Sequence, residues 1–210
     1  LFNLRRMLMN KSFIIKIIVL CLVTIKVSAI EKVILFGDSL MAGYGLPKEQ
    51  HLSVVLQNSL EVEGHKIKII NGSVSGSTSA GGLNIAEWTL SQSNIDLMIL
   101  CLGANDMLRG INPKETKNNL EEIIQIAKNK KIKIIITGMI APTSYGSEYK
   151  ESFDKIFFNL SKEYNLQLIP FLLEGVAQKP EFNLSDGMHP NDQGTIIIGN
   201  TLKKAILKNL

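Results

Sequence analysis

Four short segments rich in Gly, Ser, Asn and Asp contain the residue types that acyl-transfer chemistry needs. Such a reaction uses a hydroxyl nucleophile, a base that titrates near neutral pH, a carboxylate that orients the base, and N–H donors for the oxyanion. The four segments are 37–40 (Gly-Asp-Ser-Leu), 71–76 (Asn-Gly-Ser-Val-Ser-Gly), 103–106 (Gly-Ala-Asn-Asp) and 186–190 (Asp-Gly-Met-His-Pro).

Within these segments, five residues suit the separate roles of a serine hydrolase. Ser39 supplies a hydroxyl at a predicted strand-to-helix turn, where a helix N-terminus favours developing negative charge. Asp186 precedes His189 by three residues and can fold back to accept the imidazole Nδ1 proton. Gly76 can bring a bare backbone N–H to the reacting carbonyl, and Asn105 can add a side-chain amide. With the N–H of Ser39 these make three oxyanion donors, each worth ~3–4 kcal/mol.

Each of these residues also has an ordinary structural use. The alternatives are a helix cap for Ser39, caps or turns for Asn105 and Asp106, a positive φ angle for Gly76, a surface histidine for His189 and a turn for Asp186. Only a common location in the fold favours catalysis over these separate uses.

The hydrophobic pattern predicts that common location. Five runs rich in β-branched residues have little alternation, which is typical of strands buried on both faces. They are Val33–Phe36, Ile67–Ile70, Leu97–Leu102, Ile132–Ile136 and Leu166–Ile169.

Helical patterns lie between these runs and after the last of them. The apolar stripes are Leu52/Val55/Leu56/Ser59/Leu60, Leu120/Ile123/Ile124/Ala127 (with Pro113 in the first turn), Phe153/Ile156/Phe157/Leu160/Tyr164 and, in a last helix from near Pro190, Ile198/Leu202/Ala205/Ile206.

Alternating strands and helices predict a parallel sheet with right-handed crossovers, and hence a three-layer α/β/α sandwich. Ligands bind at the carboxyl ends of such strands, where the polar segments fall. Of the three histidines, His51 lies by the first helix and His65 at the opposite sheet edge, which leaves His189 beside Ser39.

The net charge of +4 comes from the first 29 residues. The 210 residues contain 23 Lys and Arg against 19 Asp and Glu. Residues 1–29 hold five of the bases and no acid, so residues 30–210 carry 18 bases, 19 acids and a net charge of −1. Nothing in that remainder indicates a nucleic-acid footprint.

The first 29 residues have the pattern of a secretory signal. A basic start precedes the apolar run 17–25, and Val27-Ser28-Ala29 suits a signal peptidase, with cleavage after Ala29. A membrane anchor is the alternative, but spanning a bilayer takes ~20 apolar residues, and Lys16 and Lys26 bracket only nine. We therefore expect a signal peptide over 1–29 and a single domain over 30–210. We also expect export, to the periplasm or outside the cell, with no stable membrane insertion after cleavage.

The order of the four segments resembles the four blocks of the SGNH (GDSL-type) hydrolases, especially their small exported bacterial thioesterase, arylesterase and lysophospholipase branch. The resemblance covers nearly all of residues 30–210. It implies a flavodoxin-like fold with strand order 2-1-3-4-5, and hydrolysis of carboxylic esters or thioesters of acyl substrates. It also implies Ser39 as nucleophile, His189 as base, Asp186 as its orienter, and Gly76 and Asn105 in the oxyanion hole. Ala104, where that branch often has a second Gly, touches only a turn backbone.

Other functions remain as alternatives. A phosphate- or nucleotide-binding module would use the Ser- and Gly-rich segment 72–82, which lacks P-loop and Rossmann spacing. A catalytically inactive binding domain is disfavoured because all four segments are complete. A metal hydrolase is disfavoured by the scattered histidines, and we expect no cofactor or metal and a monomer. Five apolar residues near the site suit either an acyl groove or ordinary loop packing: Met41, Leu108, Ile140, Pro142 and Tyr145.

Overall fold

Five parallel strands form one sheet in the order β2-β1-β3-β4-β5 in the computed structural model of the protein, which describes residues 30–92 and 94–210. The strands are β1 (Lys32–Gly37), β2 (Lys68–Asn71), β3 (Leu97–Cys101), β4 (Lys133–Thr137) and β5 (Gln167–Ile169). The predicted order is confirmed, and each predicted run overlaps its strand to within about one residue at either end. The predicted signal peptide lies outside the described residues.

The central strands are buried because helices cover both faces of the sheet. All five residues of β3 are buried, as are the last five of β1, whereas the edge strand β2 is only half-buried. Near-continuous apolar runs are what such doubly covered parallel strands require. The central strands therefore form the core of the domain.

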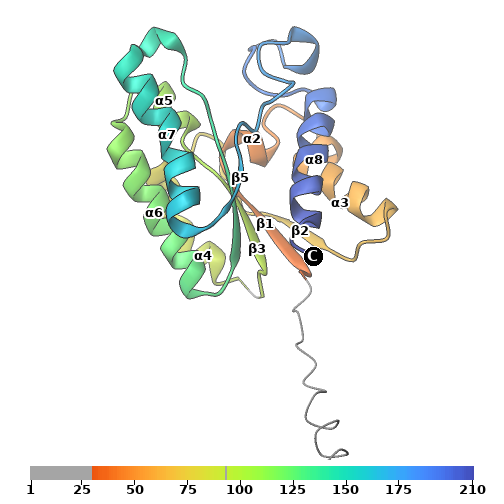
Figure 1. The fold of residues 1–210 in the computed structure, drawn as a ribbon. Helices are drawn as coiled ribbons and strands as arrows, with labels where there is room; N and C mark the ends of the chain where they lie inside the picture. Colours follow the sequence, from red (N-terminus) through yellow and green to blue (C-terminus); the bar gives the residue numbers. More distant parts are fainter. Residues whose placement is uncertain (1–29, 93) are drawn as a thin grey trace, which may run out of the picture.

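Two helical layers flank the sheet (Figure 1). Helices α3 (Leu52–Val62) and α8 (Asp192–Leu207) pack together on one face. On the other face α6 packs between its two neighbours; this layer consists of α4 (Ser79–Leu90), α6 (Pro113–Asn129) and α7 (Ser147–Tyr164). The three-layer sandwich predicted from the sequence is confirmed.

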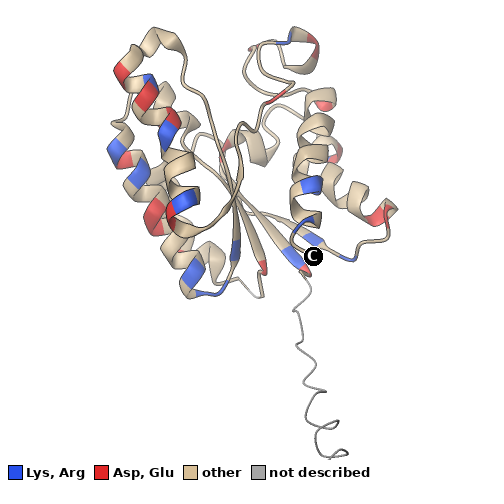
Figure 2. Cartoon of the chain, viewed as in Figure 1, with Lys and Arg blue, Asp and Glu red and all other residues tan. Residues whose placement is uncertain are grey.

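The apolar stripes predicted for the helices lie inward. Leu120, Ile123, Ile124 and Ala127 of α6 are all buried, and Pro113 occupies its first turn. Figure 2 shows Lys and Arg interspersed with Asp and Glu along α6 and α7, as expected for solvated helix faces. No helix in residues 30–92 or 94–210 is long and apolar enough to cross a membrane.

Helix α4 begins earlier than its Ser- and Gly-rich sequence indicates. The Thr78 side chain caps it by accepting a hydrogen bond from the N–H of Gly81. A Cβ on Gly82 would lie 2.2 Å from Leu102 Cδ1, so α4 approaches the Leu102 side chain closely at the end of β3. The last helix, expected from near Pro190, begins at Asp192 and is capped by Asn191.

Short helices fill the carboxyl edge of the sheet. The helices α2 (Ser39–Ala42) and α5 (Ala104–Leu108) follow β1 and β3 directly. Three single-turn 3-10 helices lie in the connections, at Lys48–Gln50, Thr143–Tyr145 and Pro180–Phe182. The predicted site residues fall on or beside this edge.

Candidate active site

The turn that presents Ser39 depends on a close approach between the two central strands. A Cβ on Gly37 would lie 2.6 Å from the carbonyl oxygen of Cys101 at the end of β3. The Asp38 side chain then accepts the Leu40 N–H at 3.1 Å and caps α2. Ser39 is thus the first residue of α2 rather than its cap. Because α2 is a single turn, its dipole is small, and negative charge at Ser39 must be stabilised chiefly by individual donors.

Ser39, His189 and Asp186 form a continuous hydrogen-bonded chain. Ser39 Oγ lies 2.9 Å from His189 Nε2, and His189 Nδ1 lies 2.7 Å from Asp186 Oδ2. Ser39 and His189 are 150 residues apart in sequence. The imidazole is largely buried and the carboxylate is one-third exposed, at 17% and 34% of their side-chain surfaces. This is the nucleophile, base and orienter geometry of a serine hydrolase.

A tight loop holds the acid beside the base. Asp186 Oδ1 accepts the backbone N–H groups of Met188 and His189, each at 2.9 Å. The N–H of Leu184 donates to the His189 carbonyl at 2.7 Å and closes the loop. These backbone hydrogen bonds lower the pKa of Asp186 from 3.8 to about 2. Asp186 is therefore both the turn former and the partner of His189, so the two alternatives from sequence are combined.

Tyr44 packs against the imidazole of His189, a contact that the sequence did not predict. Its ring centroid lies 4.4 Å from that of His189, with the planes tilted by 38°. The chain returns to this position because Gly43, in a left-handed conformation, ends α2. The tyrosine ring covers one side of the imidazole while remaining half-exposed itself.

The two predicted oxyanion donors, Gly76 and Asn105, belong to segments that contact each other. Gly76 sits in the turn 74–77 with φ +78°, and a Cβ built on it would meet nothing within 4 Å. Asn105 Nδ2 donates to the carbonyl of Ser77 at 3.0 Å. It also makes a long hydrogen bond of 3.5 Å to Asp38 Oδ2. One amide hydrogen thus secures the turn and the second is weakly engaged.

Asp38 is a fully buried carboxyl beneath this cluster. Burial raises its pKa from 3.8 to about 6, against the opposing effect of its hydrogen bond from Leu40. Its charge also interacts with His189. In the sequence Asp38 belonged to the Gly-Asp-Ser-Leu segment, but nothing in its type indicated burial.

Asp106, considered from sequence as a cap or turn residue, instead joins three helices. Its carboxylate accepts the N–H of Ser79 at 2.7 Å, a short hydrogen bond from Ser79 Oγ, and one from Thr116 Oγ1 at 3.1 Å. Asn119 Nδ2 in turn donates to Ser79 Oγ at 3.0 Å. This buried network fixes α5, and with it Asn105, against α4 and α6.

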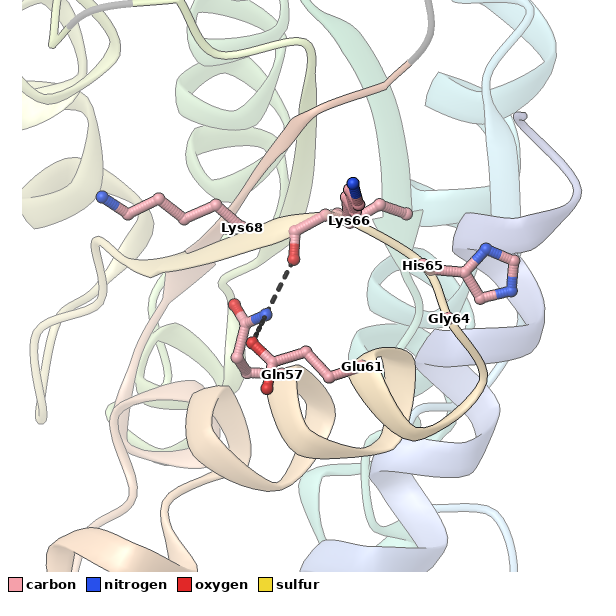
Figure 3. Close-up of a pocket in the computed structure, with 7 residues that line it drawn as sticks. Gln57, Glu61, Gly64, His65, Lys66 and Lys68 are labelled. Atoms are coloured by element: carbon pink, nitrogen blue, oxygen red, sulfur yellow. Dashed lines mark hydrogen bonds between the residues drawn. The ribbon is translucent and has the colours of Figure 1, made fainter.

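The remaining histidines lie outside the site, as predicted. His51 caps α3 and its Nε2 contacts the Leu46 carbonyl at 3.0 Å. His65 lies at the amino ends of the strands, where it lines an open recess of about 510 Å³ together with Gln57, Glu61 and Lys66 (Figure 3). In that view Gln57 bonds to the chain before β2, so the recess is a structural junction between α3 and β2.

Of the apolar residues considered for an acyl groove, Met41 belongs to the core. It is fully buried, whereas Leu108 and Ile140 are half-exposed at the carboxyl edge. Met41 therefore packs in the core from α2 and does not line a groove.

Fold and site together define a serine hydrolase of the α/β/α type, and the comparisons with known proteins agree. Residues 35–195 match the model of the GDSL-like lipase/acylhydrolase family. The chain is 36% identical to an arylesterase of Vibrio mimicus over 182 residues, 87% of this chain and 91% of that protein. It is 32% identical to thioesterase 1/protease 1/lysophospholipase L1 of Escherichia coli K12 over 187 residues, 89% and 88% of the two chains. The crystal structure of AlinE4, an SGNH-hydrolase family esterase, matches with a TM-score of 0.72 at 38% identity, covering 87% of this chain and 97% of that one.

The chain belongs to the GDSL-like lipase/acylhydrolase family. It is a carboxylic ester hydrolase with esterase and thioesterase relatives. The predicted family and reaction class are thereby confirmed over the alternatives of a phosphate-binding or inactive module. Segment 72–82, on which the phosphate-binding alternative rested, forms the turn that carries Gly76 and the first residues of α4.

Proposed function

We propose that Ser39 is the nucleophile, His189 the general base and Asp186 the residue that orients the base. The observation that carries the proposal is the unbroken hydrogen-bonded chain from Ser39 Oγ through both imidazole nitrogens to the Asp186 carboxylate. Such an arrangement lets the imidazole take the hydroxyl proton while the carboxylate stabilises the imidazolium that forms.

The proposed reaction proceeds in two halves. His189 Nε2 accepts the Ser39 proton as Oγ attacks the acyl carbonyl, and negative charge gathers on the carbonyl oxygen. The backbone N–H groups of Ser39 and Gly76 and the second amide hydrogen of Asn105 stabilise that oxyanion. His189 then passes its proton to the leaving alkoxide or thiolate, and an acyl-Ser39 ester remains. In the second half, water activated by His189 hydrolyses this ester and restores Ser39.

We propose acyl esters or thioesters as substrates because the rim of the site is apolar. Each of the five strands is followed, at the carboxyl edge, by a segment that bears one half-exposed large apolar residue. These residues are Tyr44, Val74, Leu108, Ile140 and Met188. An acyl or aryl group laid against such a rim is removed from water, which contributes about 25 cal/mol for each Å² of apolar surface buried.

The test is Ser39→Ala, measured on p-nitrophenyl esters and acyl-thioesters of increasing chain length. The variant should fold normally and lose nearly all hydrolysis of every substrate, whereas Ser144→Ala, an exposed hydroxyl at the same edge, should retain it. A fluorophosphonate should label Ser39 in the wild type and leave the Ser39→Ala protein unmodified. Turnover by Ser39→Ala within tenfold of wild type would rule the mechanism out.

We further propose that the enzyme is exported, that residues 1–29 are its signal peptide, and that residues 30–210 act as a monomeric single domain without metal or cofactor. The acid-free basic leader and the single sheet support this assignment. Incubation with a chelator should leave the rate unchanged.

A further inference from the structure

The turn that carries Gly76 is exposed and is held by hydrogen bonds. Its first residue, Val74, donates to the Gly37 carbonyl at 3.0 Å, and Ser77 donates back to the Val74 carbonyl at 3.1 Å. Val74, Ser75 and Gly76 are exposed, and apart from its chain neighbours no atom of the described residues lies within 4 Å of where a Gly76 Cβ would be. Since the turn is exposed, its position depends on the groups that bond to its carbonyls.

Two side chains of one short segment supply those bonds. Asn105, on α5, donates to the Ser77 carbonyl at 3.0 Å, and Arg109, the residue that ends α5, donates through Nη2 to the Gly76 carbonyl at 3.0 Å. Two consecutive carbonyls are therefore clamped from one side. The segment itself is anchored, because the Arg109 backbone N–H bonds to the Asn105 and Asp106 carbonyls and Asp106 lies in the buried network.

We infer that Arg109 is a positioning residue that holds the Gly76 turn where its N–H meets the oxyanion. The inference rests on the proposed function, in which Gly76 is an oxyanion donor. Arg109 bonds to the carbonyl of Gly76, which is the residue whose N–H is the proposed donor. This bond therefore restrains the position of the donor. A donor stabilises an oxyanion only within a narrow distance range, and a misplacement of about 1 Å can cost about 10²-fold in rate.

The test replaces the guanidinium and compares the transition state with the ground state. Arg109→Met should lower kcat for a short p-nitrophenyl ester about tenfold or more while KM stays within about twofold, since the clamp acts on a donor used in the transition state. An alkylboronic acid, whose tetrahedral adduct on Ser39 needs the same donors, should lose affinity by the same factor. The thermal unfolding midpoint should not change, because Arg109 is exposed.

Lys114→Met is the matched control. Lys114 is an exposed cation in the first turn of α6, and its removal takes the same charge from the same edge of the sheet. Its kcat should equal that of wild type. If Arg109→Met keeps kcat within twofold of Lys114→Met, or loses kcat and boronate affinity by unrelated factors, the inference is wrong. A wild-type protein that hydrolyses no ester contradicts the proposed function instead.

A double-mutant cycle with Asn105→Ala provides a second measurement. Because Asn105 holds the same turn, its loss already frees Gly76, and Arg109→Met should then cost threefold or less rather than tenfold. If the two losses multiply in full, Arg109 does not act through the turn.

Discussion

At the scale of single residues, Asp38 is placed where a charge is least favourable. The carboxyl is fully buried, and burial raises its pKa to about 6. The folded state therefore binds a proton more tightly than the unfolded state, in which the pKa is near 3.8. This contribution to stability is complete below pH 3.8 and is lost as the pH rises through 6. At pH 8 the protein retains a buried carboxylate at a cost of ~3 kcal/mol.

We predict that Asp38→Asn stabilises the fold at pH 8. The amide is neutral, and its oxygen can still accept the Leu40 N–H that caps α2. The gain in the free energy of unfolding should approach ~3 kcal/mol at pH 8 and vanish near pH 4, where wild-type Asp38 is protonated. Urea unfolding at the two pH values measures it. A gain that is equal at both pH values would show that burial of the charge is not its cause.

Asp186 has the opposite shift and a different consequence. Its pKa of about 2 lies below the ordinary 3.8, so its charge stabilises the fold above pH 3.8 and this contribution disappears as the pH falls toward 2. Between pH 4 and 8 Asp186 stays ionised. The acid limb of kcat/KM should therefore contain no contribution from Asp186.

We predict that Asp186→Asn lowers kcat by ~10²-fold or more, and that His189→Ala is at least as damaging. The asparagine oxygen can keep the two backbone hydrogen bonds, so the loop should persist while the imidazole loses its ionised partner. Steady-state rates and a circular dichroism spectrum distinguish these effects. Activity that continues undiminished to pH 4, where a free histidine is charged, would exclude His189 as the base.

Sequence reasoning identified the residues proposed here for the chemistry and missed two contacts around them. Ser39, Asp186 and His189 stood out because few residue types suit the roles proposed for them, and Asp186 lies three residues from His189. Tyr44 and Arg109 are common surface types, and their contacts join segments 145 and 33 positions apart. Only the folded arrangement shows such contacts.

At the scale of the elements, the Asp106 network connects stability to activity. Its carboxylate serves three donors on Ser79 and Thr116, and it belongs to the same short helix as Asn105. Leaving a buried donor without an acceptor costs ~1–3 kcal/mol.

We predict that Asp106→Ala lowers the free energy of unfolding by ~3 kcal/mol or more, and that Thr116→Val, which removes one donor and keeps the size, costs ~1 kcal/mol. Because α5 would lose its anchor, kcat should fall further in Asp106→Ala than in Thr116→Val. Chemical denaturation and ester hydrolysis on the same preparations test both. Equal stabilities of the two variants would contradict the network's role.

The strands and helices were predictable where their burial produces a recognisable hydrophobic pattern in the sequence. The strands β1 and β3 are buried on both faces and appear as unbroken apolar runs. The start of α4 was hidden because its first turn contains the glycine pair at positions 81 and 82, and glycine pairs are more often loop signals. The one-turn helices α2 and α5 are too short for any periodicity to indicate them.

At the scale of the whole molecule, the parallel sheet separates two edges with different tasks. Ser39 and His189 meet at its carboxyl edge, where the proposed oxyanion donors and the apolar rim also lie. The strand β1 begins at its amino edge (Figure 1). Ligand sites in open parallel sheets lie at the carboxyl ends of strands for this topological reason. A change at the amino edge should therefore leave the chemistry intact.

That separation bears on the prediction that export leaves Ile30 as the first residue. Ile30 is 3% exposed, and the N–H groups of Glu31 and Lys32 both bond to Asp96 Oδ2 at 2.9 Å, so the described fold includes the chain from residue 30. Removal of residues 1–29 would cost the domain none of these contacts. Intact-mass analysis of protein from a cell-envelope fraction should give the mass of residues 30–210. Ala29→Tyr, which places a large residue at the cleavage site, should retain the leader with kcat unchanged. If the wild-type protein also retains residues 1–29, the leader is a membrane anchor.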